Sequence, residues 1–312
     1  MNIATRQDLS LLKRYFTEYP SHLCVYTPGV LIMWREYFRL AVGEENETLI
    51  VRLAYDGEND TYLYPIGRDP AGALDRLIAS EHAEGRPLRL FGLDDAQKDA
   101  LLARFPDATA EADRGEADYL YNTAALAAFP GKRYAGQRNH INKFNRLYPD
   151  HTLTPLTAAD RDELSAFLGD FLEAHSDRPL LREEIEMTRE VLSHLDEYGM
   201  CGVVLRVSGR VAAFAAGEVI GDMLSVHIEK ADTKVQGSYQ KIVSGFAASV
   251  DPRAVLYLNR EDDMNNEGLR TSKLSYHPVE ILNKYPVLFM DDHKLWQPRK
   301  WSDTALDFVF PD

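Results

Sequence analysis

Apolar positions along the chain follow two periods that alternate from the N-terminus onwards. Over residues 7–18 they recur every three or four positions, as in a helix that buries one face. Short runs rich in β-branched and aromatic residues follow, separated by turns that contain Gly, Asn or Asp. The elements predicted in the first half are a helix over 7–18, strands at 37–42, 48–53 and 61–66, a helix from Pro70, a strand at 88–91, a helix over 94–105 and a strand at 118–121.

The second half shows the same kinds of element in a similar order. Thr157 is a typical N-cap residue, and Ser-Gly and Gly-Asp pairs mark tight turns between the later strands. The predicted elements are a strand at 151–153, helices over 157–174 and 183–198, strands at 202–207, 211–220 and 223–229, a helix over 239–250, a strand at 254–259, a helix over 267–276 and a strand at 286–290.

This order resembles a known architecture. Three antiparallel strands followed by helix, strand, helix and strand, with helices in front, is the order of the GNAT (acyl-CoA N-acyltransferase) fold, and the chain shows it roughly twice. We therefore predict an α/β fold with mixed sheets, made of two tandem GNAT-like domains. Residues 1–150 form the first domain, which ends in a basic linker helix at about 131–147. Residues 151–312 form the second and carry the candidate site.

The composition of the chain argues against several classes of protein. Lys and Arg number 35 against 49 Asp and Glu, a net charge of −14, which argues against a protein that binds nucleic acid over its whole surface, and no DNA partner is expected, although a local basic strip is still allowed. The two cysteines, Cys24 and Cys201, form no CxxC pair, so neither a disulfide scaffold nor a thiolate zinc site is expected. Apolar runs such as 211–216 are far too short to span a membrane, and no secretory signal begins the chain. We expect a cytoplasmic protein with no metal site.

One segment has the opposite charge from the rest. Residues 119–149 contain no acidic side chain but several Lys and Arg residues, and Arg138 and Asn142 share one face of the predicted helix. The segment is either a linker helix with a solvated basic side or a docking strip for an anion such as an RNA backbone, a phospholipid head group or a nucleotide.

A second segment, at 224–240, runs from a strand through a loop into a helix. GNAT enzymes hold the coenzyme pyrophosphate on the backbone amides that open this helix, where the helix dipole favours an anion. The candidate donor-binding residues are Lys234, Gly237, Ser238, Tyr239 and Gln240. Tyr239 stands where Gly or Ala is usual and would crowd a pyrophosphate, and an ordinary strand–helix turn is the alternative.

The same strand ends in His227, Glu229 and Lys230. Alternation places His227 and Glu229 on one side and Lys230 on the other. In a GNAT fold this strand and the one at 254–259 separate, and a side chain in that gap can take a proton from an attacking amine. The alternative is a carboxylate that pairs with Arg260 or Arg270.

The densest polar stretch is 257–278. Asn259 and Glu261 follow a strand at the edge where open α/β sheets place ligands, and Lys273 shares a helix face with Tyr276. Arg270 and Lys273 lie three residues apart on the predicted helix, so their positive charges repel each other. An anion bound beside them would offset this repulsion. The start of the stretch imitates a calcium loop, but its twelfth position is a leucine, so calcium is excluded.

Three segments together, 118–144, 227–240 and 258–279, resemble the C-terminal catalytic part of phosphatidylglycerol lysyltransferases. The resemblance covers nearly the whole chain. It implies a tandem pair of GNAT-like domains and an acyl- or aminoacyltransferase. In the lysyltransferases an aminoacyl group passes from a charged tRNA to a lipid hydroxyl. This chain shows no counterpart of their membrane-spanning domain, which argues against a lipid acceptor.

We therefore predict a transferase that moves an acyl or aminoacyl group from a coenzyme A thioester or a charged tRNA to an amine or hydroxyl, with no tightly bound cofactor. Glu229 or Glu261 is the candidate base and Tyr276 the candidate proton donor. The candidate substrate-binding residues are Arg138, Asn142, His227, Lys230, Asn259, Arg270 and Lys273, of which Arg270 and Lys273 would hold donor phosphates or the oxyanion. The alternative function is a catalytically inactive GNAT-like module that binds a nucleotide, RNA or another anionic ligand.

Overall fold

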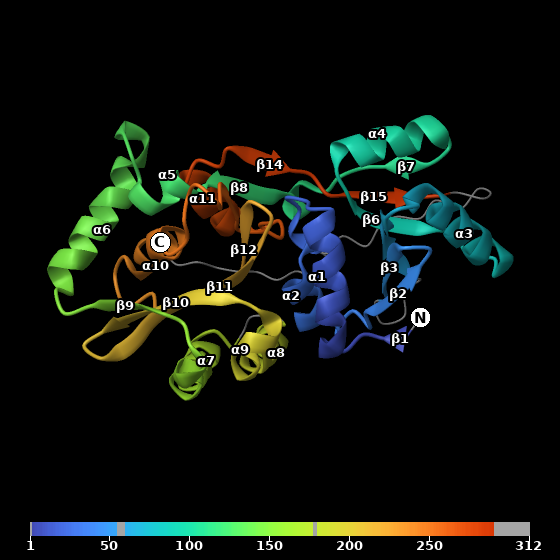
Figure 1. Cartoon of the computed structure of the whole chain (residues 1–312). Helices are drawn as coiled ribbons and strands as arrows, with labels where there is room; N and C mark the ends of the chain where they lie inside the picture. Colours follow the sequence, from blue (N-terminus) through green and yellow to red (C-terminus); the bar gives the residue numbers. More distant parts are fainter. Residues whose placement is uncertain (1, 55–59, 177–179, 290–312) are drawn as a thin grey trace. The chain divides into compact units, whose positions relative to one another are not determined.

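The computed structural model describes residues 2–54, 60–176 and 180–289, which form two compact units (Figure 1). Among the described residues, the first unit consists of 2–118 with 282–289 and the second of 119–281. Each unit is built on one mixed sheet, so the predicted fold class is confirmed. Within the described ranges, no helix combines the length and the apolar character that crossing a membrane requires.

The sheet of the first unit has the order β1-β2-β3-β4-β6-β15-β7, and β5 pairs with β3. Only β4 and β6 run parallel among the described pairs. The strands are β1 (Asn2–Ile3), β2 (Ala41–Glu45), β3 (Thr48–Leu53), β4 (Thr61–Leu63), β5 (Ile66–Gly67), β6 (Arg89–Leu93), β7 (Thr109–Ala110) and β15 (Tyr285–Leu288). The helices are α1 (Leu9–Glu18), α2 (Pro28–Met33), α3 (Pro70–Ala83) and α4 (Asp95–Arg104).

Local sequence explains where these helices begin. Asp69 accepts a hydrogen bond from the Gly72 amide, and Pro70 occupies the first position of α3. Asp94 and Gln97 form a reciprocal capping box at the start of α4.

The sheet of the second unit has the order β14-β8-β13-β12-β11-β10-β9. Its strands are β8 (Asp118–Asn122), β9 (Thr152–Pro155), β10 (Cys201–Val207), β11 (Arg210–Ile220), β12 (Met223–Ala231), β13 (Tyr257–Asn259) and β14 (Glu280–Leu282). Its helices are α5 (Thr123–Ala128), α6 (Ala135–Leu147), α7 (Arg161–Ala174), α8 (Leu181–Ser193), α9 (Leu195–Tyr198), α10 (Ser238–Ala248) and α11 (Glu267–Ser275). Figure 1 shows α5, α6 and α10 on one side of this sheet and α7 to α9 on the other.

Both units show the GNAT-like order that the sequence predicts. In the first unit β2, β3 and β4 are antiparallel, α3 follows, and β6 runs parallel to β4. In the second, β10, β11 and β12 are antiparallel, α10 follows, and β13 runs parallel to β12.

The next strand of each sheet comes from the other half of the chain. β15 pairs antiparallel with β6 in the first sheet, and β8 pairs antiparallel with β13 in the second. The structure therefore groups β8, α5 and α6 with the second unit, whereas the predicted division lies near residue 150. β8 lies between β13 and β14 in the second sheet, and its first four residues are buried. It is therefore a strand of that sheet and not part of a linker.

Some predicted elements differ in their bounds. The strand predicted at 37–42 begins only at Ala41, because residues 34–40 form turns in which Trp34, Tyr37 and Phe38 pack against one another. The short helices α2 and α5 were not predicted. The last residue of the strand predicted at 286–290 lies outside the described residues, and β15 covers Tyr285–Leu288.

We expect β15 to stabilise the first unit although it comes from the end of the chain. Val287 is 1% exposed and packs into that unit's core, so Val287→Asp places an unpaired charge there and should lower the free energy of unfolding by about 3–5 kcal/mol. Chemical denaturation measures the change, and hydrogen exchange should show lost protection in β6 and β7. The control is Val279→Asp, because Val279 is exposed. Equal effects of the two changes would contradict this account of β15.

Candidate functional site

The candidate site lies where two parallel strands of the second unit stop pairing. β12 and β13 pair only at Met223 with Tyr257, Leu224 with Leu258 and Ser225 with Asn259, after which β12 continues to Ala231. The pairing ends because β13 itself ends at Asn259, and the two residues that follow, Arg260 and Glu261, contact β12 through side chains. Bulges and strand ends of this kind re-aim side chains and occur often next to active sites.

A β-bulge places His227 in this gap. Ala216 of β11 pairs with Ile228 and Gly217 pairs with Val226, so His227 is an extra residue without a partner in the ladder between β11 and β12. A Cβ on Gly217 would lie 2.0 Å from the Ser225 carbonyl oxygen, which explains why glycine is required beside the bulge.

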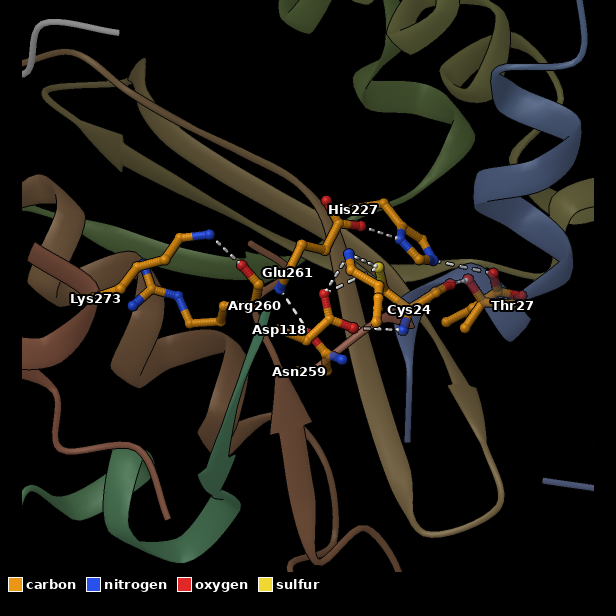
Figure 2. A network of polar contacts seen from close by, with 10 residues as sticks. Cys24, Thr27, Asp118, His227, Asn259, Arg260, Glu261 and Lys273 are labelled. Carbon is orange, nitrogen blue, oxygen red and sulfur yellow. Dashed lines mark hydrogen bonds and ion pairs between the residues drawn. The ribbon is translucent and has the colours of Figure 1, made fainter. Parts of the chain in front are cut away.

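Two carboxylates hold the imidazole of His227 (Figure 2). Nε2 lies 3.0 Å from Oε1 of Glu218 on β11, and Nδ1 lies 2.8 Å from Oε1 of Glu261, which follows β13. The His227 side chain is fully buried and that of Glu218 nearly so, whereas the side chain of Glu261 is 30% exposed. Glu261 is therefore the member of this trio, which we call the Glu–His–Glu cluster, that a substrate can contact.

The cluster fixes the charge of His227. Burial lowers the pKa of His227, but hydrogen bonds and electrostatic attraction from Glu218 and Glu261 outweigh burial and raise the pKa to about 9. At neutral pH the ring is thus an imidazolium that donates both N–H groups. It cannot act as a base there, and it orients Glu261.

The backbone around Glu261 is held in an unusual conformation. Glu261 has φ 56°, in the left-handed region that costs a non-glycine residue energy. Its N–H donates to Oδ1 of Asn259 at 2.6 Å, and its carbonyl accepts from the Tyr119 N–H of β8 at 3.1 Å. Asn259 is completely buried, so its amide acts here as a support for the loop.

Glu229, the other candidate base, is paired. Its carboxylate accepts hydrogen bonds from Nη2 of Arg260 at 2.7 Å and from Nε at 3.3 Å. The guanidinium lies 4.7 Å from the ring centre of Tyr276 and 5.8 Å from that of Tyr121. The alternative in which Glu229 pairs with Arg260 is therefore the arrangement that the structure has. Tyr276 is buried, which raises its pKa, and its ring supports Arg260.

Lys273 and Arg270 also support the loop after β13. The ammonium of Lys273 donates to the carbonyl oxygens of Arg260, at 2.6 Å, and Asp262, and its burial lowers its pKa. Arg270 forms a two-point ion pair with Asp263, with both contacts at 2.8 Å. Lys273 and Arg270 were predicted to hold donor phosphates or an oxyanion. In the structure their charged groups make contacts that fix the conformation of the loop.

Other predicted residues lie elsewhere in the second unit. Lys230 pairs with Glu184 of α8, so alternation along β12 correctly separated it from Glu229. Arg138 donates to the carbonyl oxygens of Phe129 and Gly131 and caps the end of α5. Asn142 is exposed on α6.

The predicted donor loop is covered by α6. Gly237 has φ 86°, and a Cβ there would lie 3.0 Å from the His140 carbonyl oxygen and 3.1 Å from Cβ of Phe144. The Gln236 N–H donates to the Tyr148 hydroxyl at 3.3 Å, and the Ser238 N–H donates to the Val235 carbonyl at 3.1 Å.

The remaining residues of the loop follow the same pattern. Ser238 is buried, its hydroxyl donates to the Asp232 carbonyl at 2.9 Å, and Lys234 is exposed. Tyr239 packs against the core of the unit, and Gln240 is half-buried. The described contacts of this loop are thus made with α6, with the core of the unit and within the loop itself.

Two acidic residues of the site were not predicted from the sequence. Glu218 is a charged residue within the apolar run of β11, and such a residue is rarely buried without a partner, which was a usable signal. Asp263 is fully buried and accepts from the Tyr119 hydroxyl at 2.5 Å, but its place in the loop gave no sign of this contact. Among the described residues, no group of three or more His, Cys, Asp or Glu side chains could hold a metal ion.

Comparison with known proteins gives a consistent set of similarities. The sequence profile of the family described as "Phosphatidylglycerol lysyltransferase, C-terminal" matches residues 16–288. A conserved protein of unknown function from Bacteroides thetaiotaomicron has a similar structure, with a TM-score of 0.88 and 29% identity, over 93% of this chain and 99% of that one. The structure of L-PGS from Bacillus licheniformis matches with a TM-score of 0.65 and 16% identity, over 99% of this chain and all of that one, and at this identity it supports the fold alone.

An uncharacterised protein of Mycoplasmoides gallisepticum is 25% identical over 171 residues. The match covers 54% of this chain and 55% of that protein, so it spans only about half the length of this relative.

The charge of His227 can be measured directly. Its pKa of about 9 exceeds the ordinary 6.5, so the stabilisation that the imidazolium contributes is complete below about pH 6.5 and is lost as the pH rises through about 9. A shift of this size corresponds to about 3 kcal/mol. NMR titration of the ring should show the transition near pH 9, and in Glu218→Gln it should fall by about 1–3 pH units. Glu280→Gln, on an exposed carboxylate of β14, is the control. A ring that titrates near pH 6.5 in the native protein would overturn the charge assignment.

Proposed function

Because the chain belongs to the phosphatidylglycerol lysyltransferase C-terminal family, we propose that it transfers an aminoacyl group from a charged RNA to an amine or hydroxyl. The observation that carries this proposal is the Glu–His–Glu cluster in the gap between β12 and β13, with Glu261 as its exposed member. A GNAT-like fold hosts acyl transfer in this gap, but a fold alone does not fix a reaction.

In the proposed reaction the acceptor nitrogen or oxygen attacks the aminoacyl ester carbonyl. A new bond forms to that carbon, and the bond to the RNA ribose oxygen breaks. Glu261 takes the proton from the acceptor and returns it to the leaving oxygen. His227 and Glu218 are positioning residues in this scheme, because they touch Glu261 or each other and hold the carboxylate in place.

The paired groups have supporting roles in this proposal. Arg260 contacts both carboxylate oxygens of Glu229, whose side chain is 16% exposed against 30% for Glu261, so Glu261 is the more accessible of the two carboxylates. Tyr276, Lys273 and Arg270 stabilise the loop that carries Glu261 rather than contacting the donor. Asn259 fixes the backbone N–H of Glu261.

Two observations favour an RNA-borne donor over a coenzyme A thioester. The first is the start of α10, where α6 packs so closely that a Cβ on Gly237 would lie 3.0 Å from the His140 carbonyl oxygen and 3.1 Å from Cβ of Phe144, which leaves little room for a pyrophosphate beside this loop. The second is an exposed group of basic side chains without ion pairs to any described residue, which we call the α6 basic face: Lys132, Arg133, Lys143 and Arg146. Exposed, unpaired cations of this kind attract a phosphate backbone.

The assay for the reaction uses tRNA charged with radioactive lysine, offered phosphatidylglycerol vesicles and a set of soluble amines as acceptors. We expect transfer by the native chain and a loss of about 100-fold or more in kcat for Glu261→Gln. Glu280→Gln, on an exposed carboxylate of β14, should leave the rate unchanged. RNA binding without transfer by the native chain to any acceptor would favour the inactive binding module instead.

The donor class is tested separately by binding. Calorimetric titration with coenzyme A and acetyl-coenzyme A should show no heat of binding. Binding of tRNA should weaken with salt, and Lys143→Gln with Arg146→Gln should reduce the slope of log K against log salt by about 1.4–1.8, because each lost phosphate contact removes about 0.7–0.9.

The matched control is Lys13→Gln with Arg253→Gln, which removes two exposed cations that do not belong to the α6 basic face. Tight binding of coenzyme A, or equal slopes for the two double variants, would contradict the RNA donor.

A further inference from the structure

A second buried polar cluster lies in the first unit and takes no part in the proposed reaction. Oδ1 of Asp118 lies 2.8 Å from Nζ of Lys284 and 3.3 Å from Sγ of Cys24, and Nζ lies 3.5 Å from Sγ. Cys24, Asp118 and Lys284 are 6%, 0% and 2% exposed. Figure 2 shows Cys24 directly beside Asp118.

The backbone fixes this arrangement. The Cys24 N–H donates to the other carboxylate oxygen of Asp118 at 2.7 Å, and the Thr27 hydroxyl donates to the Cys24 carbonyl at 2.6 Å. These two bonds hold the Cys24 backbone beside Asp118, and Sγ itself can leave Asp118 only by breaking its own buried hydrogen bond to Oδ1, which is costly to leave unmade. A nucleophilic sulfur, an amine and a proton acceptor are held within contact distance of one another.

We propose that peroxide converts Cys24 and Lys284 into a covalent sulfur–nitrogen crosslink. In the first step the Cys24 sulfur attacks hydrogen peroxide. The O–O bond breaks, the sulfur becomes a sulfenic acid, and the thiol proton leaves with the other oxygen as water, with Asp118 as the relay. Cys24 is 6% exposed, and peroxide is little larger than water.

In the second step Lys284 gives one ammonium proton to Asp118, and its nitrogen attacks the sulfenic sulfur. The S–N bond forms, the S–O bond breaks, and the hydroxide leaves as a second water with one proton from the nitrogen. One thiol, one amine and one peroxide thus yield one sulfenamide and two waters. A thiol reductant reverses the crosslink, since the sulfur remains at the sulfenic oxidation level.

The polypeptide chain connects the crosslink to the loop of the candidate site. Asp118 is followed by Tyr119, whose N–H donates to the Glu261 carbonyl and whose carbonyl accepts from the Arg260 N–H, both at 3.1 Å. The Tyr119 hydroxyl donates to Asp263. Taking Lys284 away from Asp118 disturbs the start of β8, and β8 holds this loop. Formation of the crosslink itself does not depend on the proposed function.

The test uses the full chain with Cys201→Ser, which removes the exposed thiol. After treatment with hydrogen peroxide, we expect the intact mass to fall by two hydrogen atoms. Tryptic digestion should join the peptide that contains Cys24 to the one that contains Lys284, and dithiothreitol should restore both. Dimedone, which traps sulfenic acids, should label little of the native protein because Lys284 captures the sulfur first.

Lys284→Arg in the same background keeps a cation beside Asp118 but cannot form the S–N bond. We expect no joined peptide and a strong gain in dimedone labelling at Cys24. Should this variant fold poorly, the dimedone competition in the native sequence still decides the question. A Cys24 that stays unreacted, that is labelled by dimedone equally with and without Lys284, or that proceeds to a stable gain of oxygen would each overturn the crosslink.

Discussion

A buried imidazolium is stable only when both of its N–H groups meet acceptors and its charge is matched nearby. In this protein that requirement connects three segments, namely β11, β12 and the loop after β13. Glu218 must sit on β11, the bulge must place His227 in the gap, and the residue after Arg260 must adopt a left-handed backbone so that Glu261 reaches the ring. The positions of Asn259, Lys273 and Arg270 follow from the last of these demands, because each secures that loop.

Regular elements of the second unit could be predicted because local signals agreed with the tertiary fold. Caps, turn pairs and the alternation of β10 to β12 all indicated the same antiparallel sheet. The candidate site was only partly predictable, because its contacts depend on the tertiary fold rather than on local signals. His227, Glu229 and Glu261 were singled out as polar residues at strand ends, but which carboxylate pairs with which cation depends on a bulge and on a left-handed residue. Neither leaves a clear mark in hydrophobic periodicity.

The charge of the basic segment could be predicted from the sequence, but its tertiary contacts could not. Its lack of acidic residues predicted a helix with a cationic side, and α6 has one. The inner side of α6 packs Phe144 and the His140 backbone against the loop before α10, which required knowledge of the tertiary contact. One helix thus packs against the loop before α10 on its inner side and exposes cations on its outer side.

The exchange of strands between the halves also constrains the order of events during synthesis. β6 is complete by Leu93, but the strand that pairs with it, β15, starts only at Tyr285. The first sheet is thus completed only after Tyr285 has been synthesised, and contacts so distant in sequence form slowly. Until then the edge of β6 that pairs with β15 lacks its partner, and an unpaired edge of this kind is a template for pairing with other chains.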